Sequence, residues 1–455
     1  MDRSEVVRRL DAQRETVRSL KQAKSDSVTI EKAVFVLKEL KQQLEQLDHG
    51  ASSDATTVAG PKKVVEDAAA SSDAAVVTPW DVGGTVDYDK LVADFGSSRI
   101  TTALLERFEK VTGVAPHPWL RRGIFFSHRD LQAILDALEA GKPVYLYTGR
   151  GPSNGMHLGH LVPFMFTKWL HDALQCPLVI QLTDDEKTIW KNIDLSETRA
   201  LGIENARDIL ALGFEMERTF VFRDSDYIGH MYPTIIDIQR SVTTTTVRSI
   251  FGFTDADAIG KIAFPAIQAA PSFPSAFPHI FGLRRDVRCL IPCGIDQDPY
   301  FRMTRDIAPK LGFHKPSLVH SMFFPPLQGV AGKMSSSNTA SAVFLTDTAK
   351  EIEKKINKHA FSGGGKTKEE QIANGANLDI DVAYQWLRFL EHDDEVLRDV
   401  AERYGSGKMF SGEVKAILIK KVQAIVEAHQ KNRELQTDEV VRKFMELRPL
   451  KGRNL

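Results

Sequence analysis

The 455-residue sequence has few cysteines and no long apolar segment, and both absences exclude classes of protein. Its three cysteines, Cys176, Cys289 and Cys293, are too few for a disulfide framework, which favours a reducing compartment. Cys289 and Cys293 could begin a metal site, but no second pair completes four ligands, so we expect no tightly bound metal. No apolar run reaches the roughly eighteen residues of a membrane span, so we expect no membrane contact.

The sequence also has no large excess of charge of either sign. The formal net charge is −1 at pH 7, so no overall basic field indicates a nucleic-acid partner, and any such contact must come from a local patch. The first residues, MDRSE, have the features of neither a secretory signal nor an Arg- and Ser-rich transit peptide. We therefore expect a cytoplasmic protein.

The sequence lacks a Walker A loop, G-x-x-x-x-G-K-[ST], but contains a different glycine loop. Residues 144–147 (VYLY) have the composition of a buried strand. Residues 148–155 form a Gly- and Pro-rich loop, and residues 157–170 begin a helix-length apolar segment. A strand, a tight glycine loop and a helix start direct backbone N–H groups and the positive end of a helix toward phosphate.

Two histidines stand at the head of that helix. His157 and His160 are three residues apart and so lie on one face, and Gly159 between them lets a ligand approach the backbone. Alone, this pair is more typical of a metal site or of ordinary capping residues. A second motif, residues 332–337 (GKMSSS), is by itself more typical of a flexible loop with a solvated lysine, Lys333.

Together and in this order, the two motifs resemble the paired signatures of class I aminoacyl-tRNA synthetases, usually H-I-G-H and K-M-S-K-S. Leu158 and Ser336 are mild departures, because both histidines and the first lysine are kept. Four further stretches are similar to the eukaryotic cytosolic tryptophanyl-tRNA synthetases: residues 177–187 (PLVIQLTDDEK), 263–271 (AFPAIQAAP), 294–302 (GIDQDPYFR) and 344–350 (FLTDTAK). This resemblance covers residues 78 to 450. The loop at residues 152–156 departs from it by being one residue shorter than usual.

The resemblance implies a function and a set of site residues. It implies a homodimer that activates L-tryptophan with ATP and Mg²⁺ and transfers it to tRNA(Trp). For catalysis it implies His157, His160, Lys333 and Ser335. For ATP binding it implies Arg150, Gly151, Gly159, His160, Gln297, Lys333, Met334 and Ser335. For tryptophan it implies Tyr147 and Gln181 at the indole N–H, Glu186, Gln268 and Gln297 near the α-amino group, and Lys187 near the carboxylate.

Three other functions remain open on the sequence alone. A tyrosyl-tRNA synthetase shares the architecture and both motifs, so that only pocket residues separate the two. A catalytically silent tRNA-binding or signalling paralogue is the second, and the intact His157, His160, Lys333 and Gln297 argue against it. The third is a nucleotidyltransferase of the same superfamily, which usually lacks a helical tail with a basic surface.

The N-terminal third divides into three segments by composition. Residues 1–50 keep helical apolar spacing in two stretches and resemble a WHEP-like helix-turn-helix appendage, a module known for tRNA or protein contacts; a coiled-coil or dimerisation hairpin is the alternative. Residues 51–80 have the composition of a flexible linker. Residues 81–142 are interpreted as the eukaryotic N-terminal extension, with a helix through Leu131–Leu138 and with Phe125 and Phe126 in packed turns.

The remaining chain indicates an α/β fold followed by a helical domain. Residues 143–345 alternate strands with helices, which implies a Rossmann-like catalytic domain around a parallel sheet. An insertion at about residues 225–285 is interpreted as a lid or dimer contact. Residues 346–455 are interpreted as a helical anticodon-binding domain, because residues 405–455 hold eleven Lys and Arg against six Asp and Glu. An ordinary solvated helical surface is the alternative.

Overall fold

The computed structural model describes residues 86–334 and 340–455, together with isolated helical positions between residues 8 and 36 and two short strands before residue 86. Apart from those positions, the predicted helical hairpin (1–50) and linker (51–80) lie outside the described residues. The chain divides into two compact units, residues 1–70 and 71–455. In the first unit, residues 8–10 are helical and Leu10 is buried.

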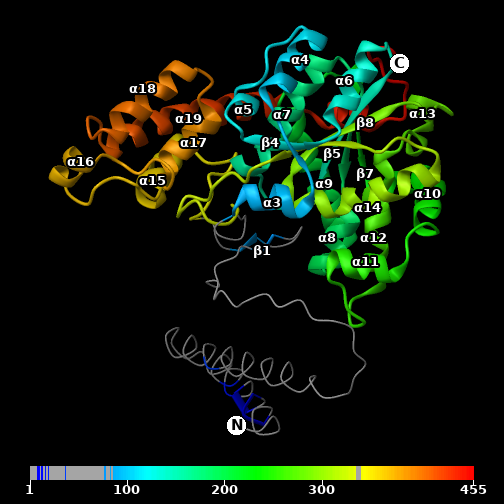
Figure 1. Cartoon of the computed structure of the whole chain (residues 1–455). Coiled ribbons are helices and arrows are strands. Elements are labelled where there is room, and N and C mark those ends of the chain that lie inside the picture. The colour runs from blue at the N-terminus through cyan, green and yellow to red at the C-terminus, as the bar shows by residue number, and fades with distance from the viewer. Residues whose placement is uncertain are drawn as a thin grey trace, which may run out of the picture. The chain divides into compact units, whose positions relative to one another are not determined.

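The second unit is built around a seven-stranded sheet of order β3-β4-β9-β8-β5-β6-β7 (Figure 1). Its strands are β3 (Ser98–Arg99), β4 (Phe125–Arg129), β5 (Val144–Arg150), β6 (Leu178–Leu182), β7 (Thr219–Arg223), β8 (Arg288–Gly294) and β9 (Ser317–Ser321). The five strands β9, β8, β5, β6 and β7 are parallel. The predicted parallel α/β fold is therefore confirmed. A separate antiparallel pair is formed by β1 (Val76–Val77) and β2 (Val82–Gly83).

One edge of the sheet was not predicted. β4 runs antiparallel to β9, and β3 runs antiparallel to β4. The interpretation of Phe125 and Phe126 as packed turns is therefore wrong, because both lie in β4 and both are buried. The five-residue stretch ends in Ser-His-Arg, and these polar residues are not typical of a buried strand. In the structure both faces of this strand are nevertheless covered. The extension thus supplies the antiparallel edge of the sheet.

Helices cover both faces of the sheet (Figure 1). The helices of this unit up to the sheet's last strand are α3 (Tyr88–Phe95), α4 (Thr102–Thr112), α5 (Pro118–Arg121), α6 (Leu131–Glu139), α7 (Leu158–Leu174), α8 (Asp184–Lys191), α9 (Leu195–Leu210), α10 (Asp224–Gln239), α11 (Thr244–Phe251), α12 (Ile259–Ala269), α13 (Pro278–Phe281) and α14 (Asp298–Ile307). Short 3₁₀ turns are η1 (Met216–Arg218), η2 (Ala270–Ser272), η3 (Pro274–Ala276), η4 (Ile295–Gln297) and η5 (Ala308–Leu311). The predicted helix after Asp130 is confirmed as α6.

Alternate residues of each strand pack on opposite sides, as strand geometry requires. In β5, Leu146 belongs to the apolar core shared with α7 and α9. Its neighbours Tyr145 and Tyr147 belong to the other core, which is shared with α10, α12 and α14. Tyr147 therefore faces the side of the sheet where the inserted helices lie.

Beyond β9 the chain is helical. The helices are α15 (Ala349–His359), α16 (Lys368–Asn374), α17 (Val382–Leu390), α18 (Asp394–Gly405), α19 (Ser411–Glu434) and α20 (Asp438–Met445). Figure 1 shows α15 to α19 gathered to one side of the sheet. After α20 the chain returns to the sheet region, where the Lys451 N–H donates to the Glu217 carbonyl at 2.8 Å. None of the described helices is long and apolar enough to cross a membrane.

Candidate active site

One cavity lies at the carboxyl ends of the parallel strands. It has a volume of about 390 Å³ and is lined by residues that follow or end β5, β6 and β8. Between β5 and β8 the order of the parallel strands reverses, because β6 and β7 lie on one side of β5 while β8 and β9 lie on the other. Ligands of open α/β sheets bind at this kind of switch point.

His157 and His160 form one wall of this cavity. Their rings stack with centroids 3.5 Å apart, at the start of α7. Burial, and then the charge of Arg150, lowers the pKa of His157 to about 3 and the pKa of His160 well below its ordinary value. Both imidazoles are therefore neutral at physiological pH and can donate hydrogen bonds without carrying charge. The side chain of His157 makes no hydrogen bond to any other described residue.

Positive charge comes from other side chains around the histidines. Arg150 at the end of β5 donates from Nη2 to Ser153 Oγ at 2.6 Å. Burial lowers the pKa of Arg150 to about 10, so the guanidinium stays charged at pH 7. Lys187 lies over Gly151, where an added Cβ would stand 2.5 Å from the Lys187 Cε. Glycine at this position thus keeps the backbone and the lysine close together.

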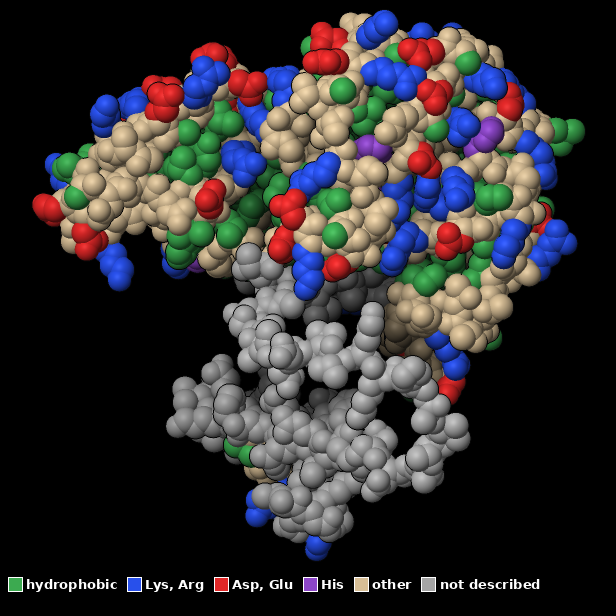
Figure 2. All heavy atoms as spheres, in the orientation of Figure 1, with side chains coloured by type: hydrophobic (Ala, Val, Ile, Leu, Met, Phe, Trp, Pro, Cys, Tyr) green, Lys and Arg blue, Asp and Glu red, His purple; other side chains and the backbone are tan. Residues whose placement is uncertain are grey.

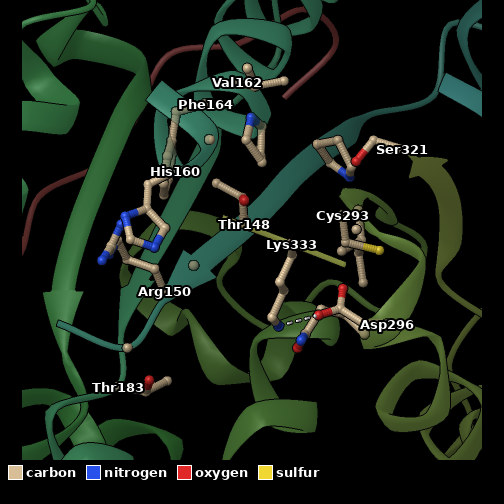
Figure 3. Close-up of a pocket in the computed structure, with 18 of the residues that line it drawn as sticks. Thr148, Arg150, His160, Val162, Phe164, Thr183, Cys293, Asp296, Ser321 and Lys333 are labelled. Carbon is tan, nitrogen blue, oxygen red and sulfur yellow. Dashed lines mark hydrogen bonds and ion pairs between the residues drawn. The ribbon is translucent and has the colours of Figure 1, made fainter. Parts of the chain in front are cut away.

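Backbone hydrogen bonds hold the histidine motif beside the segment that follows the lysine loop. The Leu158 N–H donates to the Val343 carbonyl at 3.1 Å, and the Leu345 N–H donates to the Met156 carbonyl at 2.9 Å. The loop between β9 and this segment carries Lys333 into the cavity. Lys333 Nζ lies 3.1 Å from Asp296 Oδ2, as the dashed line in Figure 3 marks.

The opposite end of the cavity holds a buried polar pair. The Tyr147 hydroxyl donates to Gln181 Oε1 at 2.5 Å and to the Gln268 carbonyl at 2.9 Å. Tyr147 and Gln181 are 3% and 1% exposed, so ordinary solvent does not satisfy them. Gln268 Nε2 donates to Gln297 Oε1 at 3.1 Å, which brings two further amides to the same end. Glu186 accepts from the Thr183 hydroxyl at 2.7 Å.

The cavity brings together every predicted site residue that the structure describes. These are Tyr147, Arg150, Gly151, His157, Gly159, His160, Gln181, Glu186, Lys187, Gln268, Gln297, Lys333 and Met334. Ser335 lies outside the described residues, so its role stays a prediction. Figure 3 shows Arg150 and His160 on one side of Lys333 and Asp296 on the other.

Two residues near the cavity were missed. Asp296 stands next to Gln297 in a stretch already singled out, yet it received no role although it pairs with Lys333. Asp224 accepts from Gln181 Nε2 at 2.8 Å. The sequence indicates its position, because it directly follows strand residues 219–223, at the sheet edge where open α/β proteins place ligands, but it does not indicate its partner Gln181.

Neither of the two cysteines that could have begun a metal site lies in a ligand cluster. Cys289 and Cys293 are buried free thiols in β8. Within the described parts of the chain, no group of three or more His, Cys, Asp or Glu side chains is arranged to hold a metal ion. With cationic and N–H donors at one end and amides at the other, the cavity has the character of a nucleotide site in an α/β protein.

Comparisons with known proteins narrow this class. Residues 139–427 match the family of tRNA synthetases class I (W and Y). The chain is 50% identical over 457 residues to the cytoplasmic tryptophan–tRNA ligase of Homo sapiens, covering 98% of this chain and 97% of that one. It is 55% identical over 384 residues to the cytoplasmic tryptophan–tRNA ligase of Dictyostelium discoideum, covering 82% and 96%. The solved tryptophanyl-tRNA synthetase of Giardia lamblia superimposes with a TM-score of 0.75 at 40% identity, covering 78% and 95%.

The chain belongs to the class I tRNA synthetases of this tryptophan and tyrosine family. The expected resemblance, drawn from the two motifs and four further stretches, is confirmed at the level of the family and the fold.

Proposed function

We propose that this chain is a tryptophan–tRNA ligase of the cytoplasm. It activates L-tryptophan with ATP to tryptophanyl-adenylate and transfers the amino acid to tRNA(Trp). One observation carries the proposal: a single cavity joins a cationic, histidine-lined end to a buried pair of hydrogen-bond acceptors, Tyr147 and Gln181. The near full-length relatives named as cytoplasmic tryptophan–tRNA ligases support it.

The chemistry requires no nucleophile from the protein. In the first step a carboxylate oxygen of tryptophan attacks the α-phosphorus of ATP in line, and pyrophosphate leaves. In the second step a terminal ribose hydroxyl of tRNA attacks the acyl carbon, and AMP leaves. The protein contributes by positioning the two substrates and by stabilising charge that develops on the phosphates.

The histidine end is suited to the triphosphate. His157 and His160 donate hydrogen bonds from neutral rings, and Arg150 supplies a fixed charge toward the distal phosphates. Lys333, with Met334 and Ser335, closes over the pyrophosphate from the other side. A lysine on a loop can strengthen its contact as negative charge moves to the leaving group, which lowers the barrier rather than only binding ATP.

The amide end is suited to tryptophan. Tyr147 and Gln181 accept the indole N–H, and a ring without that donor leaves lone pairs on these buried oxygens without a hydrogen-bond donor. Glu186, Gln268 and Gln297 hold the α-amino group. Lys187 approaches the carboxylate, next to Gly151, so that the reacting oxygen lies between the two ends of the cavity.

ATP enters as its Mg²⁺ complex. Mg²⁺ in phosphate-transfer sites is held largely by phosphate oxygens and water, with few protein ligands. Glu186 and Asp296 are the carboxylates lining the cavity, and each already accepts from a neighbouring side chain. Because both carboxylates already have partners, the metal would be held mainly by the phosphate oxygens of the nucleotide with which it arrives.

The remaining segments serve tRNA and assembly. Residues 346–455 contact the anticodon arm, residues 81–142 form the extension that borders the catalytic domain (143–345), and the WHEP-like residues 1–50 contact tRNA or protein. Figure 2 displays basic side chains interspersed with acidic ones on the visible face, so a tRNA contact on that face would use local basic sites. In the inserted segment, Tyr232, Ile236 and Ile259 are 55%, 44% and 84% exposed, which suits a homodimer contact.

Charging of tRNA(Trp) tests this function. Purified protein is incubated with ATP, Mg²⁺, labelled tryptophan and an unmodified tRNA(Trp) transcript, with a tRNA(Tyr) transcript and labelled tyrosine as the matched control. The proposal predicts labelled tRNA(Trp) only. Charging of tRNA(Tyr) with tyrosine would instead assign the tyrosyl activity of the same family.

A further inference from the structure

The amide of Gln181 is held by a residue that the proposed mechanism does not use. Asp224 is the first residue of α10, directly after β7, and is fully buried. Its Oδ1 accepts a hydrogen bond from Gln181 Nε2 at 2.8 Å. The Ile267 carbonyl lies 3.5 Å from the same nitrogen, at the limit of a hydrogen bond. Asp224 therefore supplies the short contact to this amide.

The direction of an amide is decided by its neighbours, because its oxygen and its NH₂ group have similar shapes but opposite hydrogen-bonding roles. Here the NH₂ of Gln181 faces Asp224, and its oxygen faces the Tyr147 hydroxyl. A reversed amide would direct its oxygen at the Asp224 oxygen. Its NH₂ group would then consume a lone pair of the Tyr147 hydroxyl.

The observed direction makes both Tyr147 and Gln181 present acceptors to the cavity. The hydroxyl hydrogen of Tyr147 is engaged by the Gln181 and Gln268 oxygens. Lone pairs on the oxygens of Tyr147 and Gln181 remain for a ligand, and a ring N–H is the donor that matches them. A reversed amide would present its NH₂ group next to the hydroxyl, and this donor would not pair with a ring N–H.

Asp224 can accept the hydrogen bond from Gln181 without Asp224 and Asp185 both being buried as negative charges. Asp185 lies close enough for the two carboxyl groups to affect each other's ionisation. Burial, and then the neighbouring carboxylate, raises the pKa of Asp224 well above its ordinary value, while burial raises the pKa of Asp185 to about 6. Asp184 is held separately, by the Ser225 backbone N–H at 3.1 Å. A raised pKa lets Asp224 keep its proton beside Asp185, so that the pair does not bury two negative charges.

We propose that Asp224 is a positioning residue for amino-acid selection: by holding the NH₂ group of Gln181, it keeps Tyr147 and Gln181 as acceptors and sets the preference for a ring that carries an N–H. Asp224 is not among the residues that line the cavity, so it acts through Gln181. This inference rests on the proposed function and assigns a cause to the selectivity of the same site.

Pyrophosphate exchange with two amino acids tests this inference. The probes are L-tryptophan and β-(3-benzothienyl)-L-alanine, whose ring has sulfur in place of the N–H. The ratio of their kcat/KM values is measured for the wild type, Asp224→Ala and Asp224→Asn. Asparagine keeps an acceptor oxygen and resembles a protonated aspartate, so it is the matched control. If the alanine variant does not fold, Asp224→Ser replaces it, because its shorter side chain does not reach Gln181.

The wild type is expected to prefer tryptophan by a factor on the order of 10² or more, because the analogue leaves lone pairs on buried oxygens without a donor. Asp224→Ala is expected to lose about tenfold or more of that ratio, while Asp224→Asn keeps it within a few-fold. An unchanged ratio in Asp224→Ala, or an equal loss in both variants, would overturn this inference and leave the proposed function standing. A wild type without tryptophan-dependent exchange would overturn both.

Discussion

The ammonium group of Lys333 lies 3.1 Å from the carboxylate of Asp296. The lysine belongs to the glycine and serine loop after β9, and the aspartate belongs to η4, next to Gln297. This contact holds the loop lysine at the cavity without a phosphate group present. In the proposed mechanism, the lysine would exchange this carboxylate partner for the pyrophosphate oxygens of ATP.

Replacing Lys333 with alanine should lower the rate of tryptophan activation by about 10²–10³, because one charge-stabilising donor is lost from the transition state. Tryptophan affinity should change little, because the indole end lies across the cavity. Pre-steady-state adenylate formation and equilibrium tryptophan binding measure the two effects. Lys366→Ala, at an exposed lysine of the helical domain, is the control. An activation rate within a few-fold of wild type would contradict the role assigned to Lys333.

Removing the Tyr147 hydroxyl should weaken tryptophan selection and spare ATP. Tyr147→Phe is expected to lower kcat/KM for tryptophan by about tenfold or more, because Gln181 loses a buried hydrogen-bond donor. Tyr145→Phe is the matched control, because that hydroxyl donates to the Pro271 carbonyl at 3.0 Å and does not line the cavity. Equal losses in the two variants would point to packing rather than to recognition of the indole.

Much of this site could be predicted because its chemistry is concentrated in short stretches. The five parallel strands follow from apolar runs that include residues 178–182 and 219–223, and both are fully or almost fully buried. His157, His160 and Lys333 stand in two motifs whose order indicates one family. Their convergence in one cavity could be expected because parallel strands present their carboxyl ends at a single edge.

The parts that escaped prediction depend on pairings between distant residues. β4 reads as a turn because its second half is polar, and it becomes a strand only through pairing with β9, with Phe125 opposite Ser321. Asp224 lies 43 positions from Gln181, and no local pattern links an aspartate at a helix start to an amide in another strand. The same holds for Asp296, because the sequence does not indicate that the loop carrying its partner Lys333 folds back toward it.

Acid should destabilise the protein partly through His117. This residue is 8% exposed, and its Nδ1 accepts a hydrogen bond from the backbone N–H of Trp119 at 3.1 Å. Burial, and then the nearby His392, lowers its pKa from 6.5 to about 3. The unfolded chain therefore binds a proton below pH 6.5 that the native state refuses, so stability is present above pH 6.5 and is lost as the pH falls toward 3.

Between pH 7.5 and 5.5 this one histidine should cost about 1 kcal/mol of unfolding free energy. Urea titrations of the wild type and of His117→Asn, which keeps a capping acceptor, measure the difference at each pH. The advantage of the wild type should shrink as the pH falls. A constant difference across this range would mean that His117 is not the titrating group.

Arg122 should be a main support between the extension and the helical domain. Its guanidinium donates to the Arg388 carbonyl at 2.8 Å and to Asp394 Oδ1 at 2.8 Å, and its side chain is 9% exposed. Arg122→Ala should lower stability by about 2–3 kcal/mol, because charged hydrogen bonds are lost and buried carbonyls are left unpaired. Arg107→Ala removes a more exposed pair with Asp136, 32% and 64% exposed, and should cost less than about 1 kcal/mol. Thermal unfolding of both variants checks the order, and equal shifts would contradict it.

The central claim is that this cavity activates tryptophan, and exchange of labelled pyrophosphate into ATP tests it most directly. The protein is supplied with Mg²⁺ and with tryptophan or tyrosine in separate reactions. Exchange that depends on tryptophan, with none above background for tyrosine, is the predicted result. Exchange with tyrosine, or with neither amino acid from folded protein, would contradict the assignment of Tyr147 and Gln181 as the pair that receives the indole.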